Sequence, residues 1–313
     1  MTLGCSSLLE SCLSSDLRGL GRVTLEGSQT TAMQLPAELV PTSYALAAVF
    51  AWGTSDFLGG YASRRANAFL LTTLAHASGL VFMLLVAVRT HAQFPSPHSQ
   101  LWAVVGGISG GAALAIFYRA LAAGRMGLVA PVAAVLGAAI PAIFLMTTQG
   151  RPDAVHLAGF VVAIVGIWLI SRSEDGRGRE GIGLAVLAGV GFAGFFLGIS
   201  QATDGSPAWL AAISRVGALM VTGLIALVQG KIRDMTPASA GWGLIAGCLD
   251  TSGTALFLWA SRTGRLDSAV VLTSLYPAVT VLLARLILDE HFTRRKALGM
   301  LAALLAVPMI AKG

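Results

Sequence analysis

The chain has 313 residues, of which 55% are hydrophobic and 12% are charged, and its formal net charge is +6. Soluble domains carry about 25% charged residues, so this composition excludes an ordinary soluble domain and indicates an integral membrane protein. The positive charge does not indicate a nucleic-acid partner. Lys and Arg lie mainly between apolar segments, where they orient helices against a membrane.

Residues 1–42 are Ser-rich and lack the apolar run of a signal peptide. We expect a disordered tail, within which Met33 is an alternative start to Met1. Apolar stretches of about 20 residues, the length that crosses a bilayer as a helix, follow along the chain. They predict transmembrane helices at residues 43–61, 68–88, 101–118, 126–148, 155–171, 181–202, 207–229, 241–261, 266–287 and 296–311. A polar linker, residues 172–180, separates the first five from the last five.

A shift of 140 residues aligns the two halves without a gap and predicts a first repeat at 43–171 and a second at 181–312. The matched pairs include Trp102 with Trp242, Phe117 with Phe257, and Gly124 and Arg125 with Gly264 and Arg265. Because each repeat has an odd number of helices, the second begins on the opposite side of the membrane, which gives inverted topology. Many alternating-access carriers are built in this way and hold their substrate near the midplane between the repeats.

Three segments carry a family resemblance: AWGTSDFLGG (51–60), FYRALAAG (117–124) and SRTGRLDSAVVLTSLYPAVTVLLARLILDE (261–290). They resemble the EamA family of the drug/metabolite transporter superfamily over about residues 43–311. The resemblance implies an all-α membrane protein of ten transmembrane helices, in two inverted five-helix repeats around a central cavity. It also implies a bacterial cytoplasmic (inner) membrane carrier that exports small metabolites such as amino acids and their analogues.

Two features depart from a simple reading of that resemblance. The acidic pair Asp289 and Glu290 has Gln149 and Gly150 as its counterparts in the first repeat, so it occurs only once. Lys and Arg are more numerous in the loops after odd-numbered helices, which predicts external termini. The resemblance instead implies that both termini are cytoplasmic, and the sequence leaves the orientation open.

Charged side chains inside the predicted spans are candidate site residues, because a charge at mid-bilayer costs about 2.5–3.5 kcal/mol on insertion scales. Asp56 and Asp250 could bind a cationic substrate or carry a coupling proton, and Arg215 could hold a substrate carboxylate. The alternative is a structural ion pair of an aspartate with Arg215 or with Arg119, at the end of the third span. His76, near the middle of the second span, is either a titratable site residue or a core residue.

The 140-residue shift shows that these charges are not repeated. Asp56 aligns with Phe196, Asp250 with Gly110, Arg215 with Ala75 and Arg119 with Trp259. We therefore expect a shared helical scaffold in which the charges line one asymmetric cavity.

Further candidates either line that cavity or serve packing. The aromatic candidates are Trp52, Tyr118, Trp259 and Tyr276, and Ser274 lies close to the helix-breaking Pro277. Glycines four residues apart predict close helix contacts. These pairs are Gly106 and Gly110, Gly107 and Gly111, Gly194 and Gly198, and Gly243 and Gly247.

The sequence predicts a secondary transporter of a small polar or amphipathic metabolite, acting as an exporter by alternating access, with proton coupling as one option. No P-loop and no Cys spacing of a metal site occur, so we expect no cofactor, no metal and no enzymatic activity. Two alternatives are a flippase for lipid-linked substrates and an intramembrane aspartyl protease that uses Asp56 and Asp250. Substrate identity, coupling ion, transport direction and oligomeric state stay open.

Overall fold

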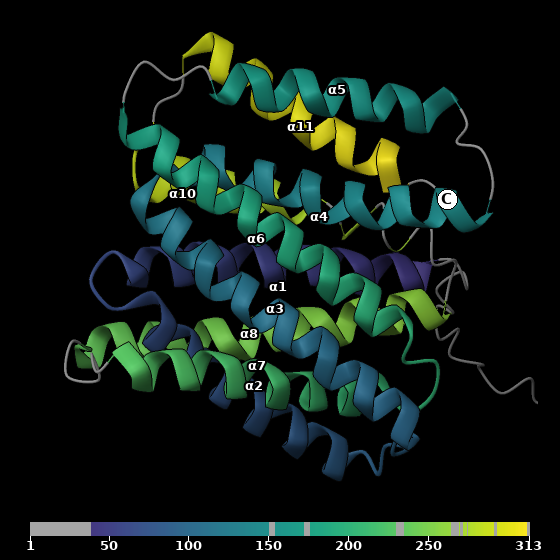
Figure 1. Cartoon of the computed structure of the whole chain (residues 1–313). Helices are drawn as coiled ribbons and strands as arrows, with labels where there is room; N and C mark the ends of the chain where they lie inside the picture. The colour runs from purple at the N-terminus through teal and green to yellow at the C-terminus, as the bar shows by residue number, and fades with distance from the viewer. Residues whose placement is uncertain are drawn as a thin grey trace, which may run out of the picture. The chain divides into compact units, whose positions relative to one another are not determined.

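The computed structural model describes residues 39–149, 154–171, 176–229, 235–263, 269, 272–273, 275–290 and 293–311. Within these ranges the chain forms helices and no strand (Figure 1). The helices are α1 (Leu39–Ser63), α2 (Ala68–Arg89), α3 (Pro97–Ala123), α4 (Met126–Gln149), α5 (Ala154–Ser171), α6 (Gly176–Ser200), α7 (Pro207–Gln229), α8 (Pro237–Thr263), α10 (Tyr276–Ile287) and α11 (Arg294–Ala311). Most of the predicted N-terminal tail, residues 1–38, lies outside the described residues.

Most predicted spans match these helices closely, and three differ from them locally. Helix α1 begins at Leu39, inside the predicted tail, and α6 begins at Gly176, inside the predicted linker. Both helices therefore continue beyond the apolar segment that predicted them, because a helix needs no apolar side chains where it meets water. In the predicted span at 266–287 the described residues 269, 272 and 273 are helical, and α10 begins at Tyr276. Pro277 lies in the first turn of α10, where the missing backbone N–H of a proline is tolerated.

Five of the described helices are long and apolar enough to cross a membrane. They cover Ala68–Arg89, Pro97–Ala123, Gly181–Ser200, Pro207–Gln229 and Pro237–Thr263. Large apolar side chains also point outward, including Val228 at 80% exposure and Leu286 at 70%. Such a surface is unfavourable in water and suits contact with lipid. The protein is an integral, multi-pass membrane protein.

The 140-residue shift found in the sequence also relates the helices. It carries the bounds of α3 onto those of α8 and the bounds of α5 onto those of α11. Packing follows the same relation: α1 contacts α8 as α6 contacts α3, and α2 contacts α8 as α7 contacts α3. The two halves therefore exchange equivalent contacts across their interface.

Equivalent helices run in opposite directions where they meet. The end of α2, at Met83 and Ala87, shares a core cluster with the start of α7, at Ala208. Thr73, near the start of α2, lies beside Gly223, near the end of α7. Helices α2 and α7 are thus antiparallel neighbours (Figure 1).

Glycine permits close approach of the helices between the repeats, as predicted. A methyl group at Gly107 of α3 would meet the carbonyl oxygen of Ser214 in α7, and one at Gly247 of α8 would meet that of Ala75 in α2. Gly106 packs directly against Gly198 of α6. These contacts confirm the packing role predicted for the paired glycines, because only a side chain of one hydrogen lets the backbones come so close.

Candidate functional site

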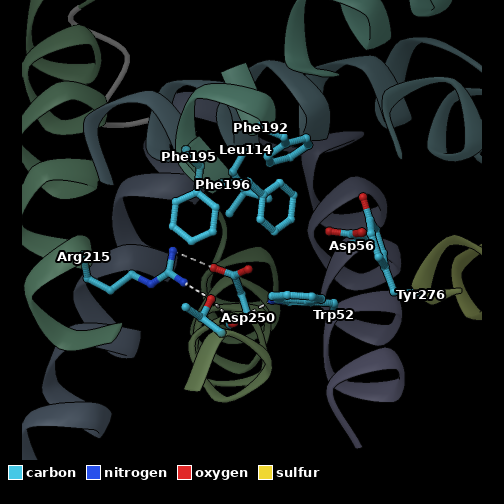
Figure 2. Close-up of a pocket in the computed structure, with 11 residues that line it drawn as sticks. Trp52, Asp56, Leu114, Phe192, Phe195, Phe196, Arg215, Asp250 and Tyr276 are labelled. Atoms are coloured by element: carbon cyan, nitrogen blue, oxygen red, sulfur yellow. Dashed lines mark hydrogen bonds and ion pairs between the residues drawn. The ribbon is translucent and has the colours of Figure 1, made fainter. Parts of the chain in front are cut away.

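A pocket with about 500 Å³ of empty volume lies where helices of both repeats meet (Figure 2). It is lined by three charged residues, five aromatic residues and three others. These are Asp56, Arg215 and Asp250, then Trp52, Phe192, Phe195, Phe196 and Tyr276, then Gly110, Leu114 and Thr254. We predicted that the charged residues within the spans line one cavity, and Asp56, Arg215 and Asp250 do line this pocket.

The lining residues recur four positions apart on four helices, which places each pair on one helix face. The pairs are Trp52 and Asp56 on α1, Gly110 and Leu114 on α3, Phe192 and Phe196 on α6, and Asp250 and Thr254 on α8. The α1 pair is related to the α6 pair by the 140-residue shift, and the α3 pair to the α8 pair. Equivalent faces of the two repeats thus line the pocket, although their side chains differ.

Arg215 and Asp250 form an ion pair in the wall of this pocket. Arg215 Nη1 lies 3.0 Å from Asp250 Oδ2, and the two side chains are 6% and 12% exposed. Arg215 Nη2 donates a hydrogen bond of 2.7 Å to Thr254 Oγ1, which in turn donates to the Asp250 carbonyl oxygen at 3.1 Å. The ion pair proposed from the sequence as an alternative to substrate binding is therefore present between α7 and α8.

Asp56 faces the same pocket without such a partner. The residue is 5% exposed, and in the described part of the chain neither a hydrogen bond nor an ion pair engages its carboxylate. Figure 2 shows this carboxylate beside the Tyr276 ring, across the pocket from Arg215. Arg215 offsets the charge of Asp250, so Asp56 is the acidic residue of the lining that has no cationic partner among the described residues.

Trp52 organises the aromatic part of the lining. Its ring centroid lies 5.8 Å from that of Tyr276 and 6.5 Å from that of Phe196, both in edge-to-face geometry. Its Nε1 donates a hydrogen bond of 3.1 Å to the carbonyl oxygen of Asp250. A second pocket, with about 370 Å³ of empty volume, shares these three rings with the first. Its other lining residues are Ala134, Ala138, Phe257, Thr273 and Val307.

The remaining sequence candidates lie elsewhere. Tyr118 is fully buried, and its hydroxyl lies 3.1 Å from Ser55 Oγ, which donates to the Ala246 carbonyl oxygen at 2.8 Å. His76 is buried in α2 outside the pocket lining. Trp259 packs against Tyr44, with ring centroids 6.3 Å apart.

Two sequence candidates remain, Arg119 and Ser274. Arg119 is exposed near the end of α3, on a different face of the helix from its buried neighbours Ala120 and Leu121. Ser274 lies outside the described residues.

The sequence analysis did not identify the phenylalanines of α6 as pocket residues, although their spacing along the helix is a signal for a shared face. Phe192, Phe195 and Phe196 have the spacing that gathers side chains on one face of a helix. Aromatic side chains within an apolar span look like ordinary packing residues, so this spacing alone does not separate a pocket face from a lipid face.

The acidic pair at the end of α10 has a structural use. Glu290 accepts hydrogen bonds from the backbone N–H groups of Met126, at 3.1 Å, and Gly127, at 3.2 Å, in the first turn of α4. It also lies 3.3 Å from Arg64 Nη2, just after α1. A carboxylate at a helix N-terminus satisfies unpaired donors and the helix dipole. Glu290 thus joins the second repeat to two segments of the first.

A different polar contact occurs in the loop between α6 and α7. Asp204 accepts a hydrogen bond of 3.1 Å from the backbone N–H of Ser96, the residue that caps α3. Hydrogen bonds from Ser99 and Ser96 hold the pKa of the Asp204 carboxyl below its usual range. Asp204 and Arg64 are 140 residues apart. These two residues occupy equivalent loops, and each contacts the other repeat. The loop of the first repeat uses a cation, Arg64, and the loop of the second uses an anion, Asp204.

Comparisons with known proteins agree with this architecture. The profile of the EamA-like transporter family matches residues 41–172 and, separately, residues 179–312. Fourteen chains of solved structures also match. One of them, a crystal structure 18% identical in sequence, superposes with a TM-score of 0.59 and covers 88% of this chain and 96% of its own, which supports the fold alone. No protein of curated function matches the chain.

Proposed function

Because the chain belongs to the EamA-like transporter family, we propose that it is a secondary transporter of a small polar or amphipathic metabolite. The substrate would occupy the pocket between the repeats and cross the membrane by alternating access. One observation carries this proposal: equivalent faces of the two repeats line a single pocket, and their polar and charged side chains are not repeated. Asp56 is equivalent to Phe196, Asp250 to Gly110 and Thr254 to Leu114. Alternating access needs two repeats of similar structure that can move against each other, and selection of a substrate needs polar groups at defined positions in the pocket between them.

Opposed helix directions support the alternating-access part of the proposal. Helices α2 and α7 are equivalent and antiparallel, as expected of ten membrane-crossing helices in two inverted repeats at 43–171 and 181–312. In such a protein one repeat can rock against the other around the central site, which opens that site to each side of the membrane in turn. Location in a bacterial cytoplasmic membrane and operation as an exporter belong to the same proposal.

The protease alternative fits the pocket poorly. Two catalytic aspartates must share a proton at hydrogen-bond distance. Asp250 is instead paired with Arg215, and among the described residues no hydrogen bond joins it to Asp56. A flippase for lipid-linked substrates would move a different substrate, so transport assays on the same reconstituted protein distinguish the two proposals.

Flux through liposomes that contain the purified full-length protein tests the proposal. We expect at least one member of a panel of amino acids, amines and nucleosides to cross faster than in protein-free liposomes. Movement of a polyprenyl-linked lipid, with no metabolite flux, would replace the proposal by the flippase. Absence of any flux by folded protein, with and without a proton gradient, would overturn both.

A further inference from the structure

Charge and aromatic lining together indicate what the pocket selects. We propose that it binds an organic cation, an amine attached to an apolar body, with Asp56 as the counter-ion. This inference rests on the proposed transport function and narrows it to a substrate class.

The charge balance of the lining favours a cation. The Arg215 guanidinium is held by the Asp250 carboxylate at 3.0 Å and by the Thr254 hydroxyl at 2.7 Å, so it is already committed. A substrate carboxylate would have to displace Asp250 and would also meet Asp56. A buried carboxylate without a partner costs free energy, and an ammonium group that enters the pocket would remove that cost.

Aromatic rings supply a second attraction of the same sign. Five of the eleven lining residues are aromatic. The face of an aromatic ring carries partial negative charge and attracts cations, most strongly when both are desolvated. Trp52 lies one helical turn from Asp56 on α1, and Figure 2 shows Tyr276 beside the Asp56 carboxylate. An ammonium group bound to Asp56 would therefore lie among these aromatic rings.

The adjoining pocket provides space for an apolar body. It begins at the three rings that both pockets share, Trp52, Phe196 and Tyr276, and most of its other lining is aliphatic or aromatic. A substrate with its amine at Asp56 could place a ring or alkyl group past Trp52.

Four probes with one phenyl ring separate charge from shape: 2-phenylethylamine, phenylalanine, 3-phenylpropionate and 2-phenylethanol. At neutral pH they are a cation, a zwitterion, an anion and a neutral molecule. Binding to the detergent-purified full chain is measured by titration calorimetry. We expect the amine to bind at least about tenfold more tightly than each of the others, because it alone adds a net positive charge.

Variants of the chain test the role of Asp56. We expect Asp56→Asn to weaken binding of the amine by about tenfold or more. Asp56→Glu keeps the charge and should retain part of the affinity. Asp204→Asn removes a carboxylate far along the chain, in the loop between α6 and α7, and should change the affinity less than twofold by this account. Ala138→Phe should weaken binding of a bulkier naphthyl amine more than binding of 2-phenylethylamine.

Several outcomes would overturn the inference. In the wild-type protein, the inference is wrong if phenylalanine, 3-phenylpropionate or 2-phenylethanol binds more tightly than 2-phenylethylamine. It is also wrong if a folded Asp56→Asn protein binds the amine as tightly as the wild type. If liposomes transport another metabolite but no amine binds, the substrate class is wrong and the transport function stands. If amines bind but nothing crosses, the transport function is wrong and the binding site stands.

Discussion

The three charged side chains of the pocket differ in what offsets their charge. Arg215 and Asp250 neutralise each other, whereas Asp56 has no such partner in the described part of the chain. All three could be found from the sequence, because charge inside an apolar span is costly and therefore conspicuous. The sequence could not decide between an ion pair and a substrate contact, since that depends on whether α7 and α8 bring the two side chains within 3.0 Å.

Loss of one partner should expose how much the ion pair stabilises the protein. Asp250→Asn leaves the Arg215 guanidinium buried without its counter-ion, which costs about 3–5 kcal/mol for a buried pair. We expect a clearly lowered midpoint of thermal unfolding in detergent. The double variant Asp250→Asn with Arg215→Met removes both charges and should recover most of the loss. Equal destabilisation by the single and double variants would show that the pair is not what holds α7 to α8.

The sequence could not show which aromatic residues line the pocket. Trp52 and Tyr276 line the pocket, but Trp259 packs against Tyr44 outside it. Nothing in an apolar span states which helix face points inward, because the rotation of each helix is set by its packing neighbours. The same reason explains why Phe192 and Phe195 were missed.

Most helices could be located from the sequence, because a segment that crosses a bilayer as a helix must have a certain length and an apolar composition. The bounds of α7 and the predicted span at 207–229 coincide. The predicted span at 266–287 contains helical residues at 269, 272 and 273 and then α10, which begins at the turn that contains Pro277. Glycine positions predicted close helix contacts, and the structure supplies the partner of each. At Gly247 that partner is the Ala75 carbonyl oxygen of α2, an identity that no sequence pattern contains.

Two glycines of α8 offer a matched test of helix packing. At Gly241 an added methyl group meets no atom within 4 Å, whereas at Gly247 it meets the Ala75 carbonyl oxygen. Gly→Ala gains about 0.5–1 kcal/mol of helix propensity at either position. We therefore expect Gly241→Ala to leave the thermal midpoint unchanged or raise it. Gly247→Ala should lower the midpoint by the equivalent of about 1–3 kcal/mol of overpacking. Similar midpoints for the two variants would contradict the close contact of α2 and α8.

At the scale of the whole molecule, duplication made the architecture predictable. A 140-residue shift visible in the sequence also relates α3 to α8 and α5 to α11. It relates the two faces that line the pocket as well, although their side chains have diverged. The lining contains both Asp56 and its equivalent Phe196, and both Asp250 and its equivalent Gly110. Symmetry therefore belongs to the scaffold, and the chemistry that would select a substrate is asymmetric.

The most direct test of the account is whether blocking this pocket stops transport. Leu114 of α3 lines the pocket, whereas Leu101 of the same helix is 60% exposed on the outer surface. Leu114→Trp and Leu101→Trp make the same change of volume at the two positions. Flux of the transported metabolite is measured in liposomes that contain equal amounts of folded protein. We expect Leu114→Trp to reduce flux to the protein-free level and Leu101→Trp to transport like the wild type. Wild-type flux through the Leu114→Trp protein would contradict it.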